Sequence, residues 1–151
     1  MYFIDRKKME ATLRFMEQQL HLFHSQPVWG TVIERAALER IAQTVVESII
    51  DVGNAMIDGF IMRDPGSYED IIDILDDESV ILPEQSAPLK DVIGLRKTLV
   101  RDYILISHDE LAAVLIANKN ELADFPNRVR AYLENELGPV SAFLPEEGEQ
   151  K

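Results

Sequence analysis

Apolar residues recur at intervals of three and four along nearly the whole chain, and no stretch sustains the alternation of a β-strand. In the first segment, the spaced apolar positions are Met9, Leu13, Met16, Leu20 and Phe23. This period places apolar side chains on one face of an α-helix, and that face is stable only when it packs against other helices. The pattern therefore predicts an all-α fold, an up-and-down antiparallel bundle of about five helices.

Capping residues and prolines divide the pattern into segments. Helices are expected over residues 5–24, 32–61, 67–75, 83–103 and 107–137, with the long second helix at the centre of the bundle. Asp5, Ser67 and Ser107 are expected N-caps, and Pro126 is expected to kink or split the last helix because it lacks a backbone donor. No linker interrupts the series. Residues 1–144 are thus expected to form one helical domain, and the polar tail 145–151 is expected to fray.

The net charge of −12 limits what the chain can bind. Contacts with phosphate need clustered lysine and arginine, so DNA is not an expected partner and any RNA contact must be local. The absence of cysteine excludes disulfides and thiolate metal sites. The sequence shows neither a signal-peptide pattern nor an apolar run long enough for a bilayer, so a cytoplasmic location without a membrane partner is expected.

The densest group of positive charge lies between Arg96 and Tyr103. Seven residues separate these two, so they share one face of a regular helix. Arg101 would point about 140° away from Arg96, at 100° per residue. A site that uses all three side chains therefore needs a break in the helix near Asp102, or a second subunit that closes over it.

The spacing of Arg96, Arg101 and Tyr103 resembles the Arg-x4-His-x-Tyr signature of the HepT-like toxins in the HEPN superfamily. The long central helix followed by a short one, and the ending Tyr132-Leu133-Glu134, are also similar to that family. The resemblance implies a ribonuclease toxin that cleaves RNA without a metal or cofactor and acts as a homodimer. It further implies that Arg96 is the catalytic arginine, and that Tyr103 is the tyrosine to which a nucleotidyltransferase antitoxin attaches AMP.

Two positions depart from the family signature: Arg101 stands where the histidine is usual, and Lys97 where an asparagine is common. Cleavage through the ribose 2′-hydroxyl needs a base, which histidine can provide and arginine cannot because it is not deprotonated in proteins. Arg96 and Arg101 can still bind phosphate and stabilise developing negative charge. The expected catalytic residues are therefore Arg96, Arg101 and Tyr103. Alternatives are a catalytically degenerate dimer that acts as a protein-binding or regulatory module, and a dimer with no role in nucleic-acid chemistry.

Other polar residues have weaker interpretations. His108 follows Arg101 at the looser spacing of the superfamily and could replace the base, although exposed polar residues are usual in the first turn of a capped helix. His21 and His24 are expected on the surface, and Trp29 is expected to staple a helix start rather than stack on a base. A polar stripe is either a solvated face of the long helix or a set of partners for Arg96 and Arg101; it consists of Gln43, Glu47, Asp51, Asn54 and Asp58.

Overall fold

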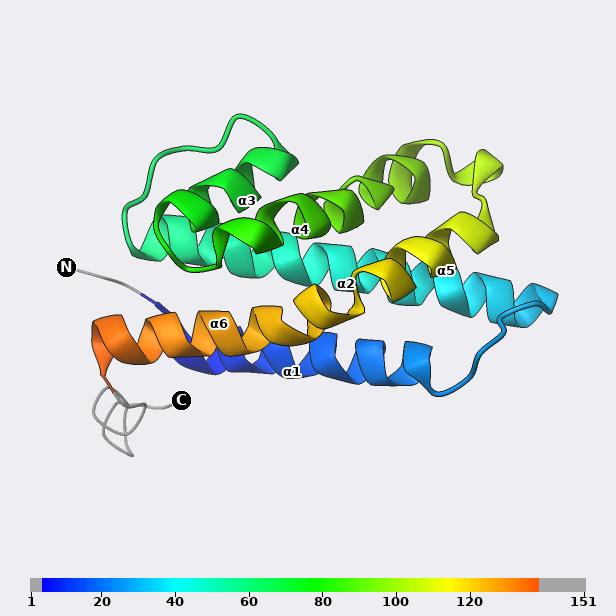
Figure 1. Cartoon of the computed structure of the whole chain (residues 1–151), viewed down its shortest axis with the longest axis horizontal. Coiled ribbons are helices and arrows are strands. Elements are labelled where there is room, and N and C mark those ends of the chain that lie inside the picture. Colours follow the sequence, from blue (N-terminus) through cyan, green and yellow to red (C-terminus); the bar gives the residue numbers. More distant parts are fainter. Residues whose placement is uncertain (1–3, 139–151) are drawn as a thin grey trace.

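A computed structural model describes residues 4–138, and within them every regular element is helical (Figure 1). The α-helices are α1 (Arg6–His24), α2 (Val32–Gly59), α3 (Tyr68–Asp77), α4 (Ser86–Ile93), α5 (His108–Ala117) and α6 (Lys119–Leu137). Short 3₁₀ turns lie at Pro83–Gln85 and Tyr103–Leu105, and a π-helical turn spans Lys97–Arg101. The all-α prediction is confirmed, with six α-helices in place of about five. The predicted tail 145–151 lies outside the described residues, and the 1–144 domain boundary stays a prediction.

Helix α2 is the central element, as its length predicted. Of its 28 residues, 14 are buried, because neighbours cover most of its circumference. In Figure 1, α1 and α6 lie side by side along one flank, whereas α3 and α4 lie along the other. Helix α5 crosses the first half of α2. The polar stripe of α2 is only partly covered: Gln43, Glu47 and Asn54 are half-buried, whereas Asp51 and Asp58 are exposed.

The predicted helix starts are confirmed at each cap. The side chains of Asp5, Ser67 and Ser107 accept hydrogen bonds from backbone N–H groups three residues later, at 3.0, 3.0 and 3.2 Å. The start of α2 carries a reciprocal capping box between Thr31 and Glu34. These bonds satisfy donors that have no partner inside the helix, and they fix where each helix begins.

The prediction for the last helix is wrong in one respect: the segment divides into two helices at Asn118 rather than at Pro126. Asn118 ends α5 and begins α6, and its buried side chain donates from Nδ2 to the Val114 carbonyl at 2.9 Å. Pro126 lies buried within α6. The apolar spacing through Leu115, Leu122 and Phe125 stays helical across the division, so the period alone could not reveal it.

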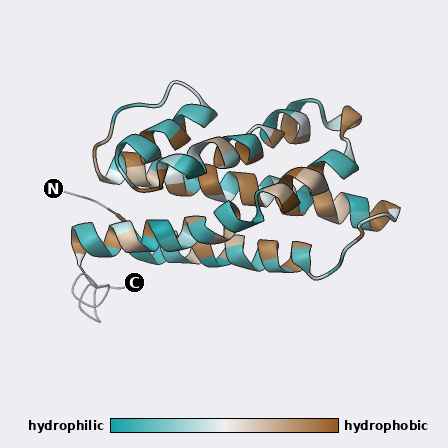
Figure 2. Ribbon diagram, viewed as in Figure 1, coloured by the Kyte–Doolittle hydropathy of each residue, from teal (hydrophilic) through white to brown (hydrophobic). Residues whose placement is uncertain are grey.

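Two stretches of the bundle depart from the predicted apolar pattern. Helix α2 ends at Gly59, two residues earlier than expected, and Ile61 follows with a positive φ of 55°. Ile33 fits the apolar spacing of the long helix and yet is exposed, as are Val32, Ile104 and Leu105. Figure 2 shows these residues as hydrophobic stretches at one end of the bundle, at the start of α2 and in the Tyr103–Leu105 turn. Among residues 4–138, no helix is long and apolar enough to cross a membrane.

Candidate functional site

Arg96 is held in place by two groups that come from different helices. Its Nε donates to Oε2 of Glu47 on α2 at 2.8 Å, and its guanidinium carbon lies 4.4 Å from the centre of the Tyr68 ring on α3. The hydrogen bond that Arg96 donates to Glu47 raises the pKa of Arg96 above its ordinary value, so the guanidinium remains charged. The side chain keeps 26% of its surface exposed. A planar cation with a carboxylate behind it and a ring beneath it is pre-oriented to bind an anion.

The helix that carries Arg96 is not regular beyond it. Residues Lys97–Arg101 form a π-helical turn, in which Asp102 N–H donates to the Lys97 carbonyl at 3.1 Å. The chain then turns through Tyr103–Leu105 in 3₁₀ form. The predicted break near Asp102 is thus present. Because the helix is irregular, the argument that placed Arg96 and Tyr103 on one face does not hold.

The structure exposes the other two predicted site residues. Tyr103 is 63% exposed, and the side chain of Arg101 has no ion-pair or hydrogen-bond partner within residues 4–138. No described hydrogen bond or ion pair joins Arg96, Arg101 and Tyr103 to one another. The cluster is therefore one fixed arginine followed by one free arginine and one free tyrosine on a tight turn.

The residues of the polar stripe of α2 lie in two different environments. Glu47 pairs with Arg96, which confirms the predicted role for that one residue. Asp51, Asn54 and Asp58 line a separate groove of about 520 Å³ against the start of α1. Burial, and then the charge of Glu47, raise the pKa of Asp51. No group of three or more His, Asp or Glu side chains in residues 4–138 is arranged to hold a metal ion.

His108 is tied to α2 rather than turned to solvent. Its Nε2 lies 2.6 Å from Oε2 of Glu39, and its side chain is 21% exposed. A carboxylate in this position orients an imidazole ring and favours the tautomer with hydrogen on Nε2. The expectation of an ordinary exposed histidine is therefore wrong. No sequence pattern predicts this pair, because 69 residues separate its members.

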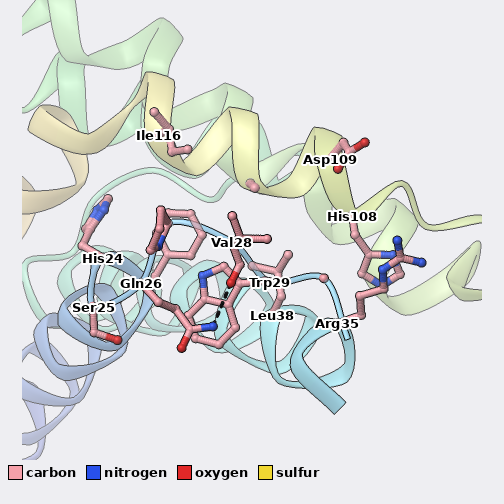
Figure 3. A pocket seen from close by; sticks show the side chains of 14 residues that line it. His24, Ser25, Gln26, Val28, Trp29, Arg35, Leu38, His108, Asp109 and Ile116 are labelled. Carbon is pink, nitrogen blue, oxygen red and sulfur yellow. Dashed lines mark hydrogen bonds between the residues drawn. The ribbon is translucent and has the colours of Figure 1, made fainter. Parts of the chain in front are cut away.

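A cavity of about 470 Å³ lies between the α1–α2 loop and the first half of α5 (Figure 3). Phe23 and Trp29 stack in its wall, with ring centres 6.3 Å apart and planes at 9°. Trp29 therefore packs against the last turn of α1, and its expected role as a staple for the start of α2 stays a prediction. His24 lines the cavity at one end, where burial and Lys119 lower its pKa. Arg35 and His108 line the cavity toward its other end.

Comparisons with known proteins show which family this chain resembles. The sequence profile of the family described as Ribonuclease HepT-like matches residues 25–129. YutE of Bacillus subtilis (strain 168), whose name marks it provisionally as an RNase, is 55% identical over 143 residues, which are 95% of this chain and 99% of YutE. A solved structure of YutE, described there as a cytosolic protein of unknown function, has a TM-score of 0.91 and covers 95% of this chain and 100% of its own.

More distant structures share the fold. A tri-AMPylated HEPN toxin of Shewanella oneidensis, in complex with MNT antitoxin, is 20% identical with a TM-score of 0.69, covering 82% of this chain and 95% of its own. A toxin–antitoxin structure with AMP-PNP is 19% identical with a TM-score of 0.70, covering 82% and 96%. At these identities the likeness establishes the HEPN-like helical fold alone.

Proposed function

The chain belongs to the HepT-like ribonuclease family, and on that premise we propose that it is an endoribonuclease toxin that a nucleotidyltransferase antitoxin neutralises. The observation that carries the proposal is the orientation of Arg96 by Glu47 immediately before an irregular turn that exposes Arg101 and Tyr103. Such a turn offers two guanidinium groups to one short stretch of RNA backbone, although the whole chain is acidic.

In the proposed reaction, which uses no metal, the ribose 2′-oxygen attacks the adjacent phosphorus and the bond to the 5′-oxygen breaks. The products are a 2′,3′-cyclic phosphate and a 5′-hydroxyl. Arg96 and Arg101 stabilise the charge that develops on the phosphoryl oxygens. The 2′-hydroxyl loses its proton to a base, and the leaving 5′-oxygen takes one from solvent.

Neither Arg101 nor His108 of the same subunit supplies that base next to Arg96. Arginine does not deprotonate, and His108 is tied to Glu39, eight residues before the Glu47 that holds Arg96. Eight residues of α-helix span about 12 Å, which is too far for one phosphate group. The base in this proposal is therefore water or a group of a second subunit.

We place the second subunit at the end of the bundle that exposes Val32, Ile33, Ile104 and Leu105. Exposed apolar residues gathered at one end are typical of a protein interface, and this end adjoins Tyr103. The exposed Tyr103 phenol would accept AMP from the antitoxin, and the added phosphate would sit beside the arginines and block RNA. The description of the Shewanella toxin as AMPylated and bound to an antitoxin supports this regulation. The proposed location is the cytoplasm.

The test is cleavage of tRNA and mRNA by the purified protein and two matched variants. Arg96→Ala is expected to lower the rate about 100-fold. Arg40→Ala, which removes an exposed arginine of α2 without a described partner, is expected to leave the rate within twofold. Absence of cleavage by the unmodified protein, or equal rates for the two variants, would overturn the proposal.

A second candidate is a degenerate dimer that binds a protein partner and has no catalytic activity. It is favoured by one observation, that an arginine occupies the position where the family signature has histidine. Restoring the histidine with Arg101→His separates the two functions. Cleavage that arises only in this variant assigns a silenced nuclease, whereas cleavage by the unmodified chain rejects the degenerate function.

A further inference from the structure

Arg35 is one of the few arginines of this acidic chain that has no partner. Within residues 4–138, six of the nine arginines donate side-chain hydrogen bonds to protein oxygens: Arg6, Arg14, Arg63, Arg96, Arg128 and Arg130. The side chains of Arg35, Arg40 and Arg101 have no described partner. Of these three, Arg35 lines the cavity between the α1–α2 loop and α5.

Arg35 and His108 both line this cavity, and Figure 3 shows them toward the same end of it. Glu39 occupies Nε2 of His108, and Nδ1 has no partner among the described residues. The Asp109 carboxylate, which also borders the cavity, points away from it. This end of the cavity therefore presents the guanidinium of Arg35, a permanent cation that has no described partner and can bind a phosphate, whereas His108 is engaged by Glu39.

One part of the cavity wall is apolar and partly aromatic, although His24, Ser25 and Gln26 also line the cavity. Leu38, Ala112 and Ile116 line it together with the stacked Trp29 and Phe23. A flat, weakly polar group such as a nucleobase buries well against such a wall. Its volume of about 470 Å³ lies within the range of small-molecule sites.

We propose that this cavity binds a phosphorylated nucleoside, with the base against Trp29 and the phosphate on Arg35. The ligand is either a free nucleoside monophosphate or one nucleotide of a single-stranded RNA. The site is distinct from the Arg96 cluster, because Arg35 lies on the first turn of α2 and Trp29 lies in the loop before it. It does not depend on RNA cleavage.

Trp29 is the sole tryptophan of the chain and forms part of the cavity wall, so its fluorescence reports on binding directly. Titration with AMP is expected to change the emission and to saturate, with calorimetry to exclude absorption by the base. Adenosine and inorganic phosphate are each expected to bind at least tenfold more weakly than AMP, because each lacks one of the two contacts. Absence of saturable binding of AMP, or equal binding of adenosine, would overturn the proposal.

Two exposed arginines of α2 provide the matched variants. Arg35→Ala is expected to weaken AMP binding at least tenfold, whereas Arg40→Ala is expected to leave it unchanged. Both are surface substitutions, and circular dichroism verifies that each variant folds. Equal affinity of the two variants for AMP would show that Arg35 does not bind the phosphate, and would overturn the proposed site.

A short single-stranded oligonucleotide distinguishes the two sources of the ligand. It is titrated into an Arg96→Ala background, so that cleavage does not consume it. Tighter binding of the oligonucleotide than of AMP assigns the cavity to an RNA chain, and the reverse assigns it to a free nucleotide. Because the readout is Trp29 emission, this result is independent of whether the unmodified protein cleaves RNA.

Discussion

The Nε of Arg96 donates to Oε2 of Glu47 across 2.8 Å, although 49 residues separate the two in sequence. One partner belongs to the central helix and the other to the start of the π-helical turn. The pair fixes the direction of the guanidinium before any ligand arrives. The Tyr68 ring beneath the guanidinium of Arg96 further restricts its orientation.

The first prediction is that Glu47→Gln lowers RNA cleavage more than it lowers stability. The side chains of Arg96 and Glu47 are 26% and 37% exposed, so the pair is expected to contribute less than about 1 kcal/mol to the free energy of unfolding. Loss of the carboxylate lets Arg96 sample other rotamers, and we expect a fall of about tenfold in the single-turnover rate. Urea denaturation and single-turnover cleavage measure the two quantities. Asp51→Asn, one turn further along α2, is the control and should cleave at the normal rate.

The contacts of the site show what sequence patterns can and cannot predict. The cap residues Asp5, Ser67 and Ser107 were predictable because their bonds are local, three residues in length. A break near Asp102 was one of two arrangements, beside a second subunit, that would bring the three predicted site residues into one site. Glu47 was predictable only as one of five residues in a stripe, since all five satisfy the same period.

Contacts that depend on helix packing gave no sequence signal. Tyr68 beneath Arg96 and Glu39 beside His108 are set by how α3 and α5 lie on α2. The division of the last helix at Asn118 was not predicted, because a buried polar side chain ends the helix there without a change in the apolar period. The cavity beside Arg35 was not predicted because it depends on helix packing: its walls come from segments about 80 residues apart.

The second prediction concerns Gly53, where α2 and α3 approach closely. A Cβ at this position would collide with Cγ2 of Ile71, a fully packed side chain. Overpacking of this kind lowers the free energy of unfolding by about 1–3 kcal/mol. The better helix propensity of alanine offsets about 1 kcal/mol of this loss. Gly53→Ala is therefore expected to lower the urea midpoint. Gly94→Ala is the control, because its Cβ would meet only two carbonyl oxygens at 3.4 Å; an equal loss in both variants would contradict the packing argument.

The third prediction concerns Arg130, which binds Glu10 and Glu17 of α1 through four hydrogen bonds of 2.8–3.0 Å. These bonds hold the pKa of both carboxyls below the ordinary 4.5. The stability they supply is thus fully present above about pH 5 and is lost as the pH falls through the lowered values. Arg130→Met is expected to cost about 1 kcal/mol at neutral pH, since the carboxylates are more than a third exposed.

Urea unfolding at pH 7 and at pH 3 checks this result. The difference between the unmodified protein and Arg130→Met should narrow in acid, where the carboxyls of both proteins become protonated. Arg128→Met, which removes an exposed pair within one helix, should cost less than about 0.5 kcal/mol. A difference that stays constant with pH would show that Arg130 stabilises the protein through packing of its aliphatic chain instead.

The fourth prediction has the opposite pH dependence. Burial, and then the charge of Glu47, raise the pKa of Asp51 above the ordinary 3.8, so the ionised carboxylate is less stable in the folded protein than in the unfolded chain. Its unfavourable contribution is absent below pH 3.8 and appears as the pH rises through the raised value. Asp51→Asn is therefore expected to stabilise the protein slightly at pH 7, by less than about 1 kcal/mol, and not at pH 3. Asp58→Asn, on the same face of α2, is the control. A gain for Asp51→Asn that is equal at both pH values would rule out desolvation of the charge as its cause.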